Sequence, residues 1–133
     1  MTRILLVDDD SIVLYTLRQI LEAAGYDVQP ASGGAMGLEF YRAQPFDVVI
    51  TDVIMPEMDG IEFMQNLRLI DPRVKVIAIS GGSGRSYFAN LEAIRHLNPV
   101  AILPKPFAKA TLLSLIENCL SEPVPERYRQ LRN

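Results

Sequence analysis

The stretch between Phe46 and Gly60 constrains the fold more than any other part of the chain. Its unbroken apolar run, Val48 to Ile50, is typical of a parallel strand that is buried on both faces. The acidic Asp52 follows closely, and Asp59-Gly60 then signals a turn and the start of a helix. Asp52 is therefore expected where a central strand ends, which is the edge at which open α/β sheets bind their ligands.

The rest of the chain repeats this alternation of strand and helix. Apolar runs predict further strands at 4–7, 27–31, 74–79 and 100–103, and helical spacing predicts helices at 11–24, 35–43, 60–70, 87–97 and 108–121. The helix at 35–43 has the weakest pattern because Gly37 lies inside it. Alternating strands and helices with short connections predict an α/β fold with one doubly wound parallel sheet.

Length and composition limit the class of protein. The 133 residues suffice for one domain, expected at 1–121, followed by an exposed tail at 122–133 that holds two prolines and three arginines. Apolar runs have only the length of strands, so no membrane span is expected, and the single cysteine, Cys119, excludes an internal disulfide. A net charge of −3 disfavours nonspecific nucleic-acid binding, and the N-terminus does not resemble a signal peptide, which predicts a cytoplasmic protein.

Polar side chains stand at the ends of four predicted strands. Asp8 and Asp9 follow the first strand and Asp52 the third, while Ser80 and Lys105 follow the last two. Because the carboxyl ends of parallel strands meet at one edge, these groups are expected to share a pocket. Two carboxylates at about 4 Å repel by about 4 kcal/mol at an effective dielectric of roughly 20, so the cluster needs a cation. Oxygen ligands without thiolate or imidazole favour Mg²⁺.

An ammonium, a hydroxyl and a cation around one carboxylate suit the transfer of a phosphoryl group. Lys105 and Ser80 would contact phosphoryl oxygens, and Asp52 would be the nucleophile. This interpretation favours a chemical role for Asp52 over a role as an ordinary turn residue. Asp10 and Asp59, in contrast, are expected to be helix N-caps.

These residues form four motifs that resemble those of response regulator receiver domains in two-component signalling. The motifs are, in chain order, Ile4 to Asp10, Asp52 to Pro56 with Met58 to Gly60, Ser80, and Lys105 to Phe107. The resemblance extends over nearly the whole chain, from about Arg3 to about Ser121. It implies a flavodoxin-like (βα)5 fold with strand order 2-1-3-4-5.

The resemblance also implies a function. Asp52 would accept a phosphoryl group from a histidine kinase or a phosphotransfer protein, and Ser80 and Lys105 would then contact this group. The surface would switch and signal to a downstream effector protein, so the chain would not be a conventional enzyme. The magnesium ligands would be Asp8, Asp9, Asp52 and the backbone carbonyl of Ile54.

Further expectations concern the surroundings of the site. The resemblance implies a cis Lys105-Pro106 bond and places kinase docking at Tyr15 and the loop 104–107. Leu115 lies at the margin of the apolar face of the last helix, which leaves a homodimer through that helix open.

Two positions depart from the family pattern. Ile102 replaces the aromatic residue that is common three positions before Lys105, so an aromatic rotamer switch is not available there. Ile54 cannot position an attacking water through its side chain, which predicts slow self-dephosphorylation.

Two other functions remain open from the sequence. The first is a magnesium-dependent phosphohydrolase with Asp52 as nucleophile, although such enzymes typically carry a second acid where this chain has Ile54. The second is a binding module that does not depend on phosphate, which the complete set of polar residues disfavours.

Overall fold

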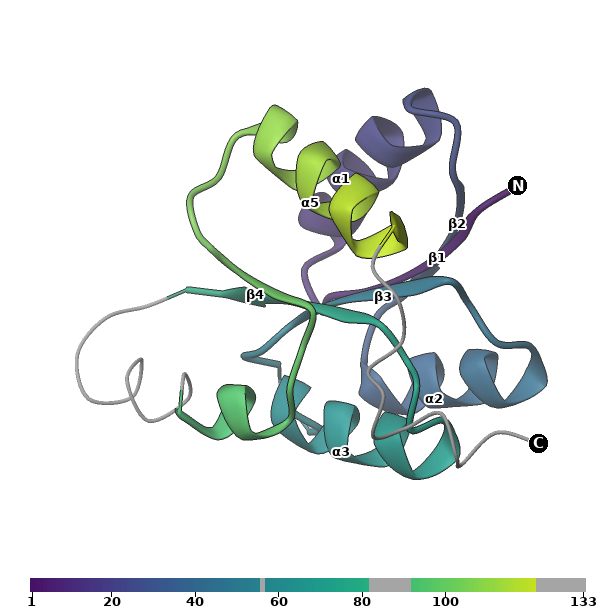
Figure 1. Ribbon diagram of the computed structural model, residues 1–133, viewed down its shortest axis with the longest axis vertical. Helices are drawn as coiled ribbons and strands as arrows, with labels where there is room; N and C mark the ends of the chain where they lie inside the picture. The colour runs from purple at the N-terminus through teal and green to yellow at the C-terminus, as the bar shows by residue number, and fades with distance from the viewer. Residues whose placement is uncertain (56, 82–91, 122–133) are drawn as a thin grey trace.

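The computed structural model describes residues 1–55, 57–81 and 92–121. Its five strands form one parallel sheet in the order β2-β1-β3-β4-β5, which confirms the predicted fold (Figure 1). The strands are β1 (Arg3–Val7), β2 (Asp27–Ala31), β3 (Val48–Asp52), β4 (Val76–Ser80) and β5 (Ala101–Pro104). The helices are α1 (Ser11–Ala23), α2 (Gly34–Ala43), α3 (Gly60–Ile70) and α5 (Lys109–Ser121).

Residues 92–96 are also helical and belong to the helix predicted at 87–97. The earlier part of that helix, most of the glycine-rich loop before it and the predicted tail at 122–133 lie outside the described residues. Within the described ranges, no helix has the length and apolar character needed to cross a bilayer.

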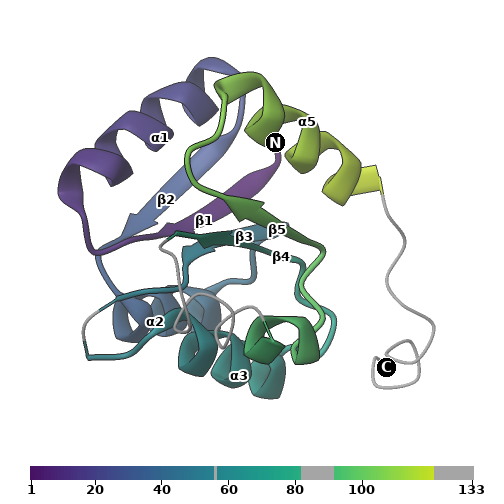
Figure 2. The same ribbon diagram turned by 90° about the vertical axis from the view of Figure 1, so that its left-hand side faces the viewer.

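Helices cover both faces of the sheet. Helices α1 and α5 lie on one face and α2 and α3 on the other, as Figures 1 and 2 show from two directions. Alternate side chains of β1 supply the two resulting cores, because successive strand residues point to opposite faces. Ile4 and Leu6 join the core beneath α1 and α5, whereas Leu5 and Val7 join the core against α2 and α3. This packing of both faces explains why the central strands have unbroken apolar runs.

The strand ends differ slightly from the predicted ones. Strand β4 was expected at 74–79 and β5 at 100–103, but pairing continues to Ser80 and Pro104, which face each other across the two strands. Asp52 is likewise the last residue of β3 and pairs with Ile79. The backbone ladder extends beyond the apolar side chains, so it holds Asp52 and Ser80 inside the sheet.

Helix α2 forms despite the internal Gly37 because the packing requires a small residue there. A Cβ at this position would lie 3.0 Å from the ring of Phe63 in α3 and 3.1 Å from a methyl group of Val7 in β1. Glycine therefore allows α2 to approach α3 and the sheet closely, which compensates for its low helix propensity.

Both predicted N-caps are confirmed. Asp10 accepts hydrogen bonds from the backbone N–H groups of Ile12 and Val13, at 2.9 and 3.4 Å. Asp59 accepts one from Glu62 at 2.8 Å. These caps satisfy amides at the starts of α1 and α3, the two helices that follow the acidic strand ends.

Candidate functional site

The carboxylate of Asp52 lies at the carboxyl end of β3, in the middle of the sheet. Its residue is only 7% exposed, although a carboxylate normally requires water. Its Oδ1 accepts a hydrogen bond from the backbone N–H of Ile54 at 3.2 Å, and its Oδ2 accepts one from Lys105 Nζ at 3.1 Å. These two contacts orient the carboxylate and supply part of the stabilisation that burial removes.

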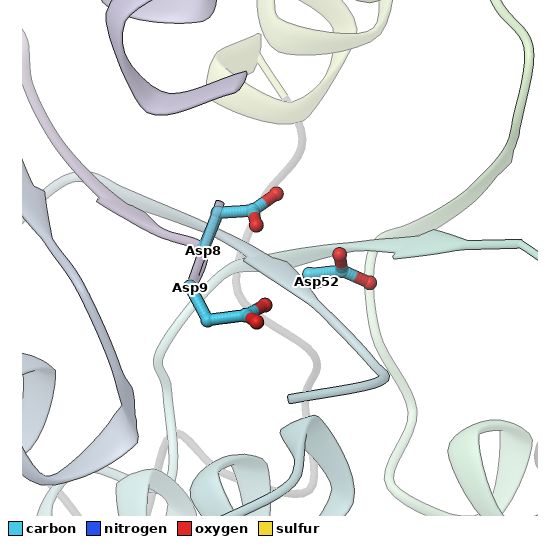
Figure 3. A group of neighbouring side chains, drawn as sticks. All are labelled: Asp8, Asp9 and Asp52. Atoms are coloured by element: carbon cyan, nitrogen blue, oxygen red, sulfur yellow. The ribbon is translucent and has the colours of Figure 1, made fainter. Parts of the chain in front are cut away.

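Asp8 and Asp9 extend from the end of β1 toward the end of β3, where Asp52 stands (Figure 3). One carboxylate oxygen from each of the three residues lies within 4.8 Å of the other two. Asp8 is buried and Asp9 is exposed. The predicted acidic cluster is thus present, with one side open to solvent.

Asp8 has an oxygen that the protein leaves unsatisfied. Its Oδ1 accepts a hydrogen bond from the N–H of Asp10 at 2.9 Å, but its Oδ2 is buried without a partner among the described residues. Burial raises the pKa of Asp8 to about 6, and the nearby carboxylates of Asp52 and Asp9 add to this rise, while the Asp10 N–H and Lys105 oppose it. A bound cation is expected beside a buried oxygen of this kind. The donors of the cluster are all oxygen atoms, which fits Mg²⁺.

Ser80 provides a second unsatisfied group at the same edge. The residue is 4% exposed, and its Oγ has no hydrogen-bond partner within the part of the chain that the structure describes. Buried hydroxyls usually find a partner, so this hydroxyl is suited to one that arrives with a ligand. Because Ser80 is on β4, next to β3, it faces the same edge as Asp52.

Lys105 reaches the site from the residue after β5. Its side chain is 39% exposed, so its ion pair with Asp52 is partly open to solvent. The Lys105-Pro106 peptide bond is cis, as the resemblance implied. The structure therefore brings Lys105 and the acidic cluster together, although Lys105 follows Asp8, the most distant member, by 97 positions in the sequence.

Backbone groups that sequence reasoning missed complete the site. The N–H of Ile54 contacts Asp52, although only a carbonyl was expected to act there. A Cβ at Gly60 would collide with the carbonyl oxygen of Asp52 and would lie 2.6 Å from the Cα of Val53. The N–H of Gly60 also donates to the carbonyl of Val53 at 2.7 Å. Gly60 therefore lets the start of α3 close against the end of β3, a role that its sequence position after an N-cap did not reveal.

A groove of about 640 Å³ opens beside the acidic cluster. It is lined by Asp9, by the loop and first turn of α2, and by Glu57, Met58 and Glu62. Because the exposed Asp9 lines this groove, a molecule from solvent can reach the cluster through it.

The side chains of the remaining predicted residues differ in their exposure. Tyr15 on α1 is 68% exposed, and the side chain of Ile54 is 55% exposed. Ile102 is partly buried against the core under α2 and α3. Leu115 is partly buried and packs on the opposite core, so the predicted homodimer surface has no added support.

Comparisons with known proteins agree with this geometry. The family profile described as the response regulator receiver domain matches residues 4–117. The response regulator receiver protein CpdR of Brucella abortus (strain 2308) is 38% identical over 120 residues, which cover 90% of this chain and 98% of that protein. The sensor kinase CckA of the same organism is 33% identical, but the match covers only 12% of it.

Solved structures show the same likeness. A response regulator receiver domain protein from Clostridium thermocellum superposes with a TM-score of 0.82 at 28% identity, covering 98% of this chain and 99% of that one. The chemotaxis protein CheY4 of Vibrio cholerae gives a TM-score of 0.82 at 28% identity over 90% of this chain and 99% of that one. With its parallel sheet and its acidic edge, this chain belongs to the response regulator receiver domain family.

Proposed function

We propose that Asp52 accepts a phosphoryl group from a histidine kinase or phosphotransfer protein and that this event switches the surface of the domain. The observation that carries the proposal is the unsatisfied polar edge around Asp52. Ser80 Oγ and Asp8 Oδ2 are both buried without partners among the described residues, while Lys105 Nζ lies 3.1 Å from Asp52. A phosphoryl group on Asp52 would bring acceptor oxygens that satisfy Ser80 and Lys105.

Asp8, Asp9, Asp52 and the backbone carbonyl of Ile54 would hold Mg²⁺. When bound, this ion would neutralise negative charge on the carboxylates and on phosphoryl oxygens. The hard oxygen ligands and the unsatisfied Oδ2 of Asp8 support this assignment.

The chemical step follows from the position of Asp52. A carboxylate oxygen attacks the phosphorus of a phosphohistidine, the phosphorus–nitrogen bond breaks, and the imidazole leaves with the bonding electron pair. The N–H of Ile54 and the ammonium of Lys105 hold the carboxylate in place for this attack. Lys105 also balances the charge that builds up on the phosphoryl oxygens.

The switch would pass through Ser80 and Lys105. Ser80 is the last residue of β4 and Lys105 directly follows β5, so their movement toward the phosphoryl group would move the ends of these two strands. Reversing a population from 1:99 to 99:1 needs about 5.5 kcal/mol, and charge-assisted hydrogen bonds to Ser80 and Lys105 would supply a large share. Ile102 cannot take part through an aromatic rotamer, so the proposed output runs through Ser80 and the segment that follows it.

The kinase is expected to dock beside the site. Ile12 and Tyr15, three residues apart on α1, are 76% and 68% exposed, and Ile54 adds another exposed apolar side chain. Together with the loop 104–107, these exposed residues are the proposed docking surface for the partner protein. A downstream effector would read the switched surface, and a cytoplasmic location follows from the same proposal.

The alternative phosphohydrolase finds no support in the site. The position two residues after Asp52, where such an enzyme would place a second acid, is Ile54, whose side chain is exposed and apolar. Slow loss of the phosphoryl group is expected because this side chain cannot orient a water molecule.

Intact-mass measurement after incubation with acetyl phosphate and Mg²⁺ tests the proposal. Wild type should gain the mass of one phosphoryl group, and Asp52→Asn should gain none. Asp59→Asn is the matched control, because it changes another aspartate near the site and keeps a side chain able to cap α3. Equal labelling of wild type and Asp52→Asn would refute the role of Asp52.

A further inference from the structure

Thr51 places a hydroxyl inside an apolar core, one residue before Asp52. The residue is fully buried, and Val49 and Val53, two positions away on either side, belong to the core against α2 and α3. A valine would fill almost the same volume, whereas a buried hydroxyl is costly unless it has a hydrogen-bond partner. The hydrogen bond of this hydroxyl is therefore what distinguishes threonine from valine here.

The Thr51 hydroxyl donates to the backbone carbonyl of Asp52 at 2.9 Å. In the trans peptide that follows Asp52, this carbonyl points away from the N–H of Val53, which bonds to the carbonyl of Ile79 on β4 at 3.1 Å. The Asp52 carbonyl therefore points toward β1, but β1 pairs with β3 only as far as Val7 and Thr51. The hydroxyl thus replaces a strand partner, because β1 ends too early to provide one.

The next peptide group after Asp52 is held as well. The carbonyl of Val53 accepts a hydrogen bond from the N–H of Gly60 at 2.7 Å, and the N–H of Ile54 donates to Asp52 Oδ1 at 3.2 Å. The chain therefore reaches the carbonyl of Ile54 through two peptide groups that are bonded on both sides. The bond from Thr51 is the first contact of this series.

We propose that Thr51 is a positioning residue for the magnesium site. By holding the peptide after Asp52, its hydroxyl keeps the carboxylate of Asp52 and the carbonyl of Ile54 in the arrangement that a shared cation requires. Because Thr51 bonds to the main chain, it acts on the ion only through that peptide. The inference rests on the proposed function, since the cation is the one assigned to that site.

Calorimetric titration with Mg²⁺ tests the inference in the full chain. Thr51→Val keeps the buried volume and removes the hydrogen bond, so it should bind Mg²⁺ about tenfold more weakly than wild type. Its labelling by acetyl phosphate should slow at low Mg²⁺ and recover when Mg²⁺ is in excess. Thr51→Ser keeps the hydroxyl and removes a methyl group, so it should bind Mg²⁺ within about twofold of wild type although its core is less well packed.

Ile50→Val is the matched control for stability. Ile50 is fully buried in the same strand, in the core beneath α1 and α5, and its side chain has no hydrogen-bonding group. This variant should unfold more easily than wild type and bind Mg²⁺ as wild type does. Equal Mg²⁺ affinities of Thr51→Val and wild type overturn the inference. A Thr51→Ser affinity as low as that of Thr51→Val also overturns it, because packing would then be responsible.

Amide exchange in EDTA gives a readout that does not involve the ion. The N–H of Val53 belongs to the peptide that Thr51 holds, so it should exchange faster in Thr51→Val than in Thr51→Ser or Ile50→Val. The same exchange rate in all three variants would show that Thr51 does not hold this peptide, and the inference would be wrong.

Two outcomes separate this inference from the proposed function. Wild type that neither binds Mg²⁺ nor gains a phosphoryl group refutes the proposed function, and the inference with it. Wild type that does both, alongside an unimpaired Thr51→Val, refutes the role of Thr51 alone. If Thr51→Val fails to fold, Thr51→Ala is compared with Thr51→Ser, because these two variants differ only by the hydroxyl.

Discussion

Asp8 is a buried carboxylate whose charge the metal-free protein tolerates poorly. Its pKa is near 3.8 in the absence of the fold and is raised to about 6, chiefly by burial. The folded state therefore binds the proton more tightly, and Asp8 stabilises the fold below about pH 4. This contribution is lost as pH rises through about 6.

Replacing this residue should stabilise the protein in the absence of metal. Asp8→Asn keeps an oxygen for the Asp10 N–H but carries no charge, so the free energy of unfolding in EDTA should rise by up to about 3 kcal/mol near pH 7.5. The gain should shrink toward pH 4, and added Mg²⁺ should stabilise wild type but not the variant. Urea denaturation at several pH values measures both effects, and a destabilised variant at pH 7.5 would contradict them.

Lys105 is expected to have opposite effects on metal binding and on phosphorylation. Its ammonium lies 3.1 Å from Asp52 and repels any cation held there. Lys105→Met should therefore bind Mg²⁺ several-fold more tightly while its labelling by acetyl phosphate slows. Calorimetric titration with Mg²⁺ measures the first effect, and weaker binding by the variant would show that Lys105 does not face the cation.

At the scale of elements, the junction of β3 and α3 depends on one glycine. Gly60→Ala places a methyl group against the Asp52 carbonyl, so the variant should lose about 2 kcal/mol or more of unfolding free energy and should label poorly. Gly33→Ala is the control, because no atom lies within 4 Å of its Cβ, and it should lose less than about 1 kcal/mol. Equal losses in thermal or urea unfolding would show that the close approach is unimportant.

The sequence predicted elements better than their ends. Apolar runs located all five strands, yet β4 and β5 continue to Ser80 and Pro104, because main-chain pairing does not require apolar side chains. Parallel topology was enough to bring Asp8, Asp52 and Lys105 to one edge. The close approach at Gly60 was not predictable, since it depends on the path of the folded backbone.

The contacts of Arg68 were not predictable for the same reason. Its guanidinium donates to the main-chain carbonyls of Pro72, Val74, Leu97 and Asn98. Every residue has such a carbonyl, so only the folded structure determines which ones Arg68 reaches. A single arginine near a helix end gives no sign in the sequence of which segments it will join.

At the scale of the whole molecule, the exposed apolar surface on α1 should matter only to a protein donor. Tyr15→Ala should slow phosphoryl transfer from a cognate histidine kinase by roughly tenfold, as expected for loss of an aromatic contact at an interface. Labelling by acetyl phosphate, which needs no docking, should be unchanged. Leu69→Ala removes another exposed apolar side chain, on α3, and should leave both reactions unchanged. Unaltered transfer from the kinase to Tyr15→Ala would place docking elsewhere.

Chemical mapping of the phosphoryl group tests the role of Asp52 most directly. Borohydride reduces an aspartyl phosphate to homoserine, so wild type treated with acetyl phosphate and Mg²⁺ and then with borohydride carries a permanent mark at the modified position. Tandem mass spectrometry should find homoserine at position 52 and not at 8, 9 or 59. Homoserine at any of those other positions, or at none, would contradict the assignment of Asp52 as the phosphoacceptor.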